Sequence, residues 1–192
     1  MDYLKDLNKE QLNAVSHIDG PCLVVAGAGS GKTKVLTTRI AYLIDNGIPS
    51  NKILAITFTN KAAKEMRERV EKIVKDNYSF VGTFHSFGLR IIKENYEKLG
   101  LLRNFTILDS DDQISLIKKI EKDMGISPKE IEPAYVRNRI SLIKNDMLND
   151  AELSKFFVTD IEKIVVDIYH RYEELLKKNS VVDFDDLLKL PV

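Results

Sequence analysis

Apolar positions in the first half of the chain alternate between short continuous runs and helical spacing. Continuous runs of this length are typical of parallel strands buried on both faces, and they cover residues 22–26, 53–57 and 80–83. Each run precedes a stretch whose apolar residues recur every three or four positions, which predicts helices near residues 32–45, 62–73 and 89–99. Strands joined by helical crossovers predict a parallel α/β sheet.

Short polar signals mark the ends of these elements. Asn8 is predicted to cap a short helix that contains Gln11. Asn46 and Gly47 are predicted to end the helix that begins at Lys32.

After Gly100 the pattern becomes mainly helical, apart from one strand-like run at 105–108. Ser110 and Gln113 have the spacing of a capping box, which is the usual start of a helix. Helices are predicted near residues 114–124, 135–145, 151–157 and 160–178. The second half is therefore expected to be a mostly helical unit.

Composition is that of a soluble globular chain of 192 residues with a formal net charge of zero. Residues 1–93 carry 14 basic and 9 acidic side chains, and the remainder carries 15 and 20, so the charges are +5 and −5. A basic front half is suited to phosphates, although charge alone favours two ordinary solvated surfaces.

No apolar run approaches the roughly 20 residues of a membrane span, and the first residues lack a signal-peptide pattern. A lone cysteine, Cys22, excludes an internal disulfide, and we expect a protein of the reducing cytoplasm.

A glycine-rich segment between a predicted strand and a predicted helix is the strongest chemical signal. It reads Ala26-Gly27-Ala28-Gly29-Ser30-Gly31-Lys32-Thr33, which fits the phosphate-binding loop except for alanine at its first position. Its glycines permit backbone N–H groups to turn toward phosphate oxygens, and the helix N-terminus adds partial positive charge. Lys32 is expected to contact the β- and γ-phosphates, and the Thr33 hydroxyl to bind Mg²⁺. A plain glycine-rich turn is the alternative, but the strand-to-helix context favours the phosphate loop.

Four further segments occur in order along the chain with this loop. They are Leu7-Asn8-Lys9-Glu10-Gln11, Thr57-Phe58-Thr59-Asn60-Lys61-Ala62-Ala63 with Gly82-Thr83-Phe84-His85-Ser86, and Asp183-Phe184-Asp185-Asp186-Leu187-Leu188. Together with the loop, this set resembles the UvrD/Rep/PcrA family of superfamily 1 DNA helicases, over nearly the whole chain.

The resemblance implies a set of ATP-binding residues, which are Gln11, Ala26, Gly27, Ala28, Gly29, Ser30, Gly31, Lys32, Thr33 and Arg39. Lys32 and Thr33 are also the catalytic residues that it implies, with ATP and Mg²⁺ as cofactors. Gln11 is expected to recognise the adenine edge, since its amide has donors and a carbonyl suited to N6 and N7. Spacing alone favours a solvated helix residue at that position.

The resemblance also implies that single-stranded DNA binds at Phe58, Thr59, Asn60, Lys61, Thr83, Phe84, His85 and Ser86. These residues are expected on loops at the carboxyl ends of strands, where α/β sheets bind ligands. Phe58 and Phe84 suit base stacking, although residue type alone favours core packing for both. His85 is either a polar contact to DNA or a buried histidine with its hydrogen bonds satisfied, and its spacing from His17 and His170 does not suggest a metal site.

Taken as a whole, the resemblance implies an α/β fold in which a RecA-like P-loop parallel sheet core carries an inserted α-helical subdomain and is truncated. The expected domains are the first part of the motor core at 1–93, the inserted subdomain at 94–180 and a return to the core at 181–192. The implied function is the ATP- and DNA-binding part of a 3′→5′ DNA helicase or translocase in repair or replication. Its implied partners are single-stranded or partly duplex DNA and the remaining helicase domains, with no membrane.

Other interpretations are a P-loop nucleotide kinase, a nucleotide- and DNA-binding module without turnover, and a helicase subunit of a nuclease complex. The kinase interpretation does not explain the segment 57–61.

Two aspartates are candidates for the Walker B acid, which P-loop motors use to hold Mg²⁺. Asp109 follows a strand-like run but precedes Ser110, whose expected role is capping, and Asp183 follows only two apolar residues. We therefore reject both and expect the Walker B motif, the arginine finger and the second motor domain to lie outside this sequence. The chain alone is then expected to bind ATP without helicase-like turnover.

Overall fold

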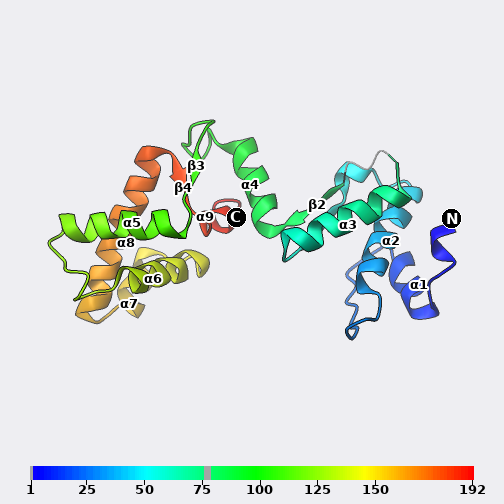
Figure 1. Cartoon of the computed structure of the whole chain (residues 1–192), viewed down its shortest axis with the longest axis horizontal. Coiled ribbons are helices and arrows are strands. Elements are labelled where there is room, and N and C mark those ends of the chain that lie inside the picture. Colours follow the sequence, from blue (N-terminus) through cyan, green and yellow to red (C-terminus); the bar gives the residue numbers. More distant parts are fainter. Residues whose placement is uncertain (1, 76–78) are drawn as a thin grey trace. The chain divides into compact units, whose positions relative to one another are not determined.

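The computed structural model describes residues 2–75 and 79–192, and they form two compact units, Met1–Phe84 and His85–Val192 (Figure 1). These are unit 1 and unit 2. The division falls within the first turn of helix α4.

Unit 1 consists of helices around a short parallel strand pair. Its regular elements are α1 (Lys9–Ser16), α2 (Lys32–Asp45), β1 (Leu54–Thr57), α3 (Asn60–Ile73) and β2 (Phe80–Thr83), with 3-10 turns at Asp2–Leu4 and Ser50–Lys52. Asn8 caps α1 as predicted, and Gln11 completes a capping box by bonding back to the Asn8 amide.

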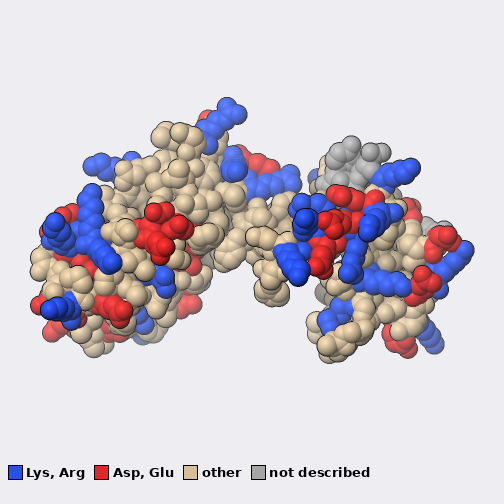
Figure 2. Space-filling model, viewed as in Figure 1, with Lys and Arg blue, Asp and Glu red and all other residues tan. Residues whose placement is uncertain are grey.

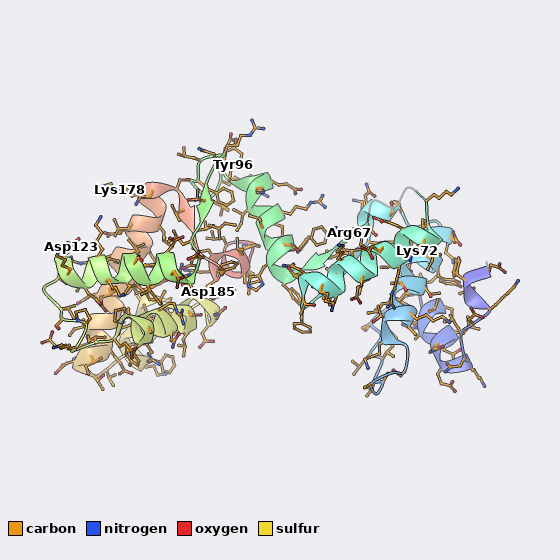
Figure 3. All side chains as sticks on the ribbon, viewed as in Figure 1. Arg67, Lys72, Tyr96, Asp123, Lys178 and Asp185 are labelled. Atoms are coloured by element: carbon orange, nitrogen blue, oxygen red, sulfur yellow. The ribbon has the colours of Figure 1, made fainter. Side chains whose placement is uncertain are left out.

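Strands β1 and β2 pair in parallel, with Leu54 opposite Phe80 and Thr57 opposite Thr83. Helix α3 is the crossover between them and buries the apolar face carrying Ala63, Met66 and Val70. The guanidinium of Arg67, labelled in Figure 3, donates a 2.7 Å hydrogen bond to the Val81 carbonyl and so ties α3 to the edge of β2.

The predicted strand at Cys22–Ala26 is wrong. The segment has no strand structure, and the side chains of Leu23 and Val25 are 90% and 89% exposed. A buried parallel strand needs hydrogen-bonding neighbours and a layer over each face, and in the described part of the chain β1 pairs only with β2. The apolar run predicts burial but supplies no pairing partner.

Unit 2 is a helical unit with one small parallel ribbon. Its elements are α4 (Phe84–Asn95), which begins at the last residue of unit 1, β3 (Thr106–Ile107), α5 (Ser110–Asp123), α6 (Pro133–Asn145), α7 (Asp150–Phe156), α8 (Asp160–Asn179), β4 (Val181–Val182) and α9 (Asp186–Lys189). Helices α5, α6 and α8 enclose a core that includes Ile117, Ile120, Val136, Ile140, Ile143, Val165, Ile168 and Tyr172. The strand-like run at 105–108 becomes β3, which pairs in parallel with β4.

The predicted capping box at Ser110 is displaced by one residue. Asp109 is the N-cap of α5, and its Oδ1 accepts 2.9 Å hydrogen bonds from the amides of Asp111 and Asp112. Asp112 replaces Gln113 as the reciprocal partner, and Gln113 is buried. Pro133 occupies the first position of α6, where its missing N–H has no cost.

The observed architecture is mixed α/β and mostly helical, with two small parallel sheets. The domain boundaries expected at residues 93 and 180 stay a prediction, since the compact units divide after Phe84 and describe packing only. Among the described helices, none has the length and apolar character needed to cross a membrane.

Glu121 of α5 is 0% exposed, and neither of its carboxylate oxygens has a hydrogen-bond partner among the described residues. Burial raises the pKa of this carboxyl, against the opposing effect of Lys118. A raised folded-state pKa means that the charged form opposes folding above that pKa and that protonation relieves this as pH falls.

We expect Glu121→Met to raise the free energy of unfolding at pH 8 by about 1 kcal/mol, because it removes a buried, unpaired charge from a similar volume. The gain should shrink as pH falls toward 4, as the wild-type carboxyl takes up its proton. Urea unfolding at both pH values measures it, with the exposed Glu174→Met as the matched control. An equal gain at both pH values would contradict the assignment to charge.

Candidate nucleotide and DNA sites

The glycine-rich loop of unit 1 has the backbone conformations that its glycines were expected to provide at two of three positions. Gly29 and Gly31 have φ values of 75° and 83°, in the left-handed region, whereas Gly27 does not. The loop closes as a turn in which the Ser30 hydroxyl donates a 2.7 Å bond to the Gly27 carbonyl. The left-handed φ favours glycine at position 31, and a Cβ there would lie 2.9 Å from Gln11 Nε2 and displace that amide.

Helix α2 begins directly after this loop, with Gly31 as its N-cap and Lys32 as its first residue. The amides of Lys32, Thr33 and Lys34 precede any possible helical acceptor, so they are available to an anion at the helix N-terminus. The Lys32 ammonium lies within the loop and donates to the carbonyls of Ala26 at 2.9 Å and Gly27 at 2.6 Å. Donor groups and charge thus converge where a phosphate chain would lie, and these residues fit a polyphosphate.

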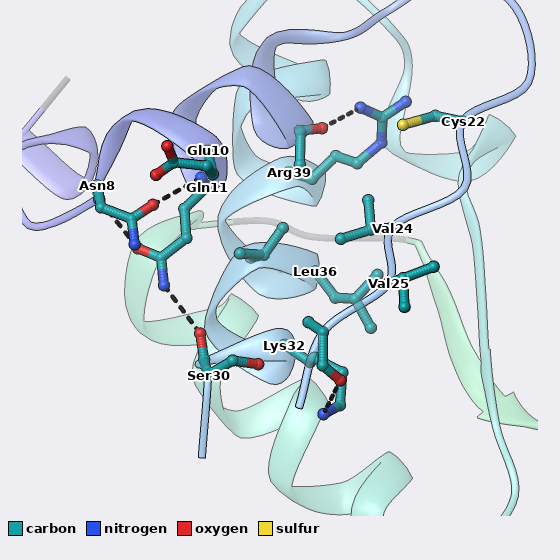
Figure 4. A pocket seen from close by; sticks show the side chains of 13 residues that line it. Asn8, Glu10, Gln11, Cys22, Val24, Val25, Ser30, Lys32, Leu36 and Arg39 are labelled. Carbon is teal, nitrogen blue, oxygen red and sulfur yellow. Dashed lines mark hydrogen bonds between the residues drawn. The ribbon is translucent and has the colours of Figure 1, made fainter. Parts of the chain in front are cut away.

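Gln11 connects α1 to the phosphate loop. Its Oε1 accepts from the Asn8 amide at 3.0 Å, and its Nε2 donates to the Ser30 carbonyl at 3.0 Å (Figure 4). One amide hydrogen and one oxygen lone pair remain, enough for contact with an adenine edge. The bond between Asn8 and Gln11 could have been predicted from their spacing, which is that of a capping box. No feature of the sequence predicts the bond from Gln11 to Ser30.

Arg39 is half-buried on α2, and its Nη1 donates to the carbonyls of Ala14 at 2.7 Å and Val15 at 3.4 Å. It therefore caps the last turn of α1. Figure 4 shows its guanidinium on the wall of a hollow, beside Cys22.

That hollow has a volume of about 460 Å³, within the range of small-molecule sites. It brings together five of the predicted ATP-binding residues: Gln11, Ala26, Ser30, Lys32 and Arg39. Its lining also includes the apolar side chains of Val24, Val25, Val35 and Leu36, together with Asn8, Glu10, Ala14 and Cys22. A floor of this kind beside a charged loop suits a flat base attached to phosphates.

Phe58 and Phe84 form a pair of exposed rings in unit 1. Phe58 is 91% exposed and Phe84 is 52% exposed, so the core packing that residue type favours is wrong for both. Their centroids lie 6.4 Å apart at an interplanar angle of 56°, a spacing typical of interacting aromatic pairs. Each ring follows the carboxyl end of a strand, where bases of a nucleic acid could stack on them.

Thr59, Asn60 and Lys61 lie at the start of a helix and Thr83 at the end of a strand, whereas open loops were expected from the sequence. Thr59 is the N-cap of α3, and its Oγ1 accepts from the Ala62 amide at 3.1 Å. Asn60 and Lys61 are exposed in the first turn of α3, whereas Thr83, at the end of β2, is buried. Lysine and arginine side chains alternate with acidic ones over the α3 region in Figure 2, so that face has no single sign of charge.

His85 and Ser86 belong to unit 2 and lie in the first turn of α4, again not on a loop. His85 is exposed, so the buried alternative is wrong. Its ring contacts Phe184 edge-on, with centroids 6.3 Å apart at 71°.

The two aspartates weighed as Walker B candidates have other roles. Asp109 caps α5. Asp183 lies in a buried ionic cluster, defined here as Lys144, Glu173, Asp183 and Asp186, in which its Oδ2 accepts from Lys144 at 2.7 Å and from the Tyr172 hydroxyl at 2.9 Å. The sequence did not reveal this cluster, because a lysine in an amphipathic helix is normally solvated.

The members of the buried ionic cluster shift one another's pKa values. Burial by itself would lower the pKa of Lys144, but the carboxylates of Asp186, Asp183 and Glu173 outweigh that effect and raise it above its ordinary value. Glu173 also pairs with Lys189 at 3.2 Å, whereas Asp183 and Asp186 share Lys144. Burial raises the pKa of Asp186 to about 6, against the pull of Lys144 and with the help of the neighbouring Asp183 carboxylate. Over the described residues, no group of three or more histidine, cysteine, aspartate or glutamate side chains is arranged to hold a metal ion.

The chain matches the family described as UvrD/REP helicase N-terminal domain over residues 7–192. The ATP-dependent DNA helicase PcrA of Bacillus subtilis (strain 168) is 46% identical over 188 residues, which cover 96% of this chain and 25% of that relative. PcrA of Staphylococcus aureus (strain Mu50 / ATCC 700699) is 44% identical, with 96% and 26% covered. PcrA of Leuconostoc citreum is 41% identical over 190 residues, with 97% and 25% covered. The chain therefore spans about a quarter of the length of these relatives.

Lys32→Ala tests the nucleotide site. We expect affinity for ATP to fall about 10- to 100-fold, as a charge-assisted contact to phosphate is worth roughly 1.5–3 kcal/mol. Stability should hardly change, because the Lys32 side chain is exposed. Titration of a fluorescent nucleotide measures the affinity, and Lys34→Ala, in the same helical turn, is the control. Equal affinities for wild type and Lys32→Ala would refute the site.

Phe58→Ala and Phe84→Ala test the ring pair. Each should weaken single-stranded DNA binding by about 1–3 kcal/mol while the melting temperature stays nearly constant, since both rings are exposed. If both rings hold the same base, the double variant should lose less than the sum.

Anisotropy of a labelled oligonucleotide at two salt concentrations measures this binding, which should weaken as salt rises. Phe156→Ala is the matched control, because this ring on α7 is 54% exposed, close to the 52% of Phe84. Affinity unchanged in both variants and insensitive to salt would show that these rings do not contact DNA.

Proposed function

The chain belongs to the UvrD/REP helicase family, and from that premise we propose that it is the ATP- and single-stranded-DNA-binding N-terminal part of an ATP-dependent DNA helicase. One observation carries the proposal. The Lys32 ammonium lies within the phosphate loop, and loop residues also line a hollow of the size and apolar character that suit a base. The relatives named as ATP-dependent DNA helicases support it, although the chain spans only a quarter of their length.

ATP is proposed to bind with its base in the hollow and its β- and γ-phosphates at the loop. The Lys32 ammonium donates to two backbone carbonyls of the loop. Phosphate oxygens can take the place of these carbonyls as acceptors, so that the ammonium loses no hydrogen bond. The Thr33 hydroxyl is proposed to hold Mg²⁺, whose charge offsets that of the phosphates. Gln11 links the helix before the loop to the loop itself, so it can respond to both base and phosphate.

DNA is proposed to lie against the carboxyl ends of β1 and β2. Phe58 and Phe84 provide stacking surfaces of the kind that bind single strands without sequence preference. Asn60 and Lys61 are exposed at the start of α3 and can contact phosphates together with the positive end of that helix. The structure favours a smaller role for Thr83, whose side chain is buried.

The finer assignments follow from the family alone. We propose 3′→5′ movement, a role in DNA repair or replication, a cytoplasmic location and association with further helicase domains. A helicase subunit of a nuclease complex is the alternative that shares these motifs.

For this chain alone we propose binding without rapid turnover. Both oxygens of Asp183 are occupied, by Lys144, Tyr172 and the Asp186 amide, so this carboxylate is not available to Mg²⁺ or to an attacking water. Asp109 uses its Oδ1 to cap α5, which gives it a structural role at a helix start. Phosphoryl transfer depends on carboxylates that are free to hold Mg²⁺ and on an arginine finger worth about 10³–10⁵ in rate.

Phosphate release with and without single-stranded DNA tests this proposal. We expect no DNA-stimulated turnover on the usual enzymatic scale of ~1–10³ s⁻¹, while nucleotide and DNA binding persist. Lys32→Ala identifies contaminating activity, because a contaminant is insensitive to it. DNA-stimulated hydrolysis that Lys32→Ala abolishes would contradict the binding-only proposal, and loss of binding to both ligands would contradict the function itself.

A further inference from the structure

Side chains on one face of α6 form hydrogen bonds with the acidic segment 183–186 of unit 2. Ser141, Lys144 and Asn145 lie at helical spacings that place them on the same face. Lys144 Nζ donates to Asp183 at 2.7 Å and to Asp186 at 2.8 Å. The Ser141 hydroxyl and the Asn145 amide each donate to Asp185 Oδ1 at 3.1 Å. Every acid of the segment is therefore bound to this helix, which we call the α6 clamp.

The same segment is also closed upon itself. The Asp183 amide donates to Asp186 Oδ2, and the Asp186 amide donates to Asp183 Oδ1, both at 3.0 Å. Lys144 is fully buried and Asp183 nearly so, so these ionic contacts are shielded from water and cannot exchange freely with it. The backbone on both sides of Phe184 is thus fixed.

Phe184 is the one residue of the segment that the clamp does not bind, and its side chain is 48% exposed. Its ring meets His85 edge-on at 6.3 Å, while Asp185, labelled in Figure 3, lies beside α9. A ring held by a fixed backbone restricts the rotamers of the imidazole that it contacts. No other aromatic contact of His85 occurs among the described residues.

We propose that Lys144, with Ser141 and Asn145, is a positioning residue that orients His85 through Phe184. Lys144 does not touch DNA or nucleotide in this role. It determines where the Phe184 backbone lies, and the Phe184 ring determines which way the His85 imidazole faces. The consequence for DNA binding rests on the proposed function, but the orientation of His85 does not.

The orientation is tested by NMR on the whole chain without DNA, from the imidazole proton shifts of its three histidines. His85 is assigned with His85→Gln, and His17 and His170 serve as internal controls. Phe184→Leu removes the ring current and gives the shift of an unoriented His85. We expect the Ser141→Ala/Asn145→Ala double variant to move the His85 signals part of the way to that value, and Lys144→Met to move them further.

Lys144→Met leaves the Asp183 and Asp186 carboxylates without their cation, while Glu173 keeps Lys189 at 3.2 Å, and this change risks unfolding unit 2. The milder double variant therefore decides the question. One outcome would overturn the proposal: the double variant is folded with a lowered melting temperature, but its His85 signals stay at their wild-type positions. The α6 clamp would then stabilise unit 2 without orienting His85. The matched control is Ser154→Ala, a serine on α7 that donates to a helix carbonyl and should leave His85 unchanged.

Oligonucleotide anisotropy on the same variants separates this proposal from the proposed function. A moved His85 signal with weaker DNA binding supports both. A moved His85 signal with unchanged DNA binding supports the positioning role and contradicts a DNA role for His85.

Discussion

A lysine ammonium group removed from water is stable only where anionic oxygens replace its hydration shell, and Lys144 imposes this requirement on unit 2. Its partners come from α8 and from the chain after β4, so α6, α8 and the 183–186 segment must meet at one point. Removal of Lys144 would leave the buried carboxylates of Asp183 and Asp186 without a counter-ion, which is costly. The apolar core of α5, α6 and α8 provides the driving force, and the buried ionic cluster selects the register in which it packs.

Unit 1 is held together differently. Polar side chains reach across it to backbone carbonyls, as Gln11 does to Ser30, Arg39 to Ala14 and Lys34 to Asp6. Such bonds fix loops that contribute few apolar contacts, and each is exposed or only partly buried. A ligand that offers better acceptors can therefore replace them at modest cost, which suits a site whose contents change.

Much of the helical fold is predictable from sequence because apolar periodicity and capping residues are local. Asn8 and the helix beginning at Lys32 follow from a few neighbouring residues. Asp109 and Ser110 are both good caps, and only the reach of the carboxylate to two amides decides between them.

Long-range features were not predictable from local pattern. Cys22–Ala26 has the composition of a buried strand, but pattern alone says nothing of partners. Hydrophobicity places Phe58 in a core, yet its position after a strand end leaves it in solvent. The ion pairs of Lys144 with Asp183 and Asp186 join residues that are 39 and 42 positions apart in the sequence, and no local signal marks them. In the candidate site, the motif identified the loop residues, whereas the bond from Gln11 to Ser30 required coordinates.

The extended segment Cys22–Ala26 also affects how the chain behaves in concentrated solution. Its apolar side chains face water and it has no strand partner among the described residues, so it can accept a strand from a second molecule. Self-association through such an edge rises with concentration and competes with the native monomer.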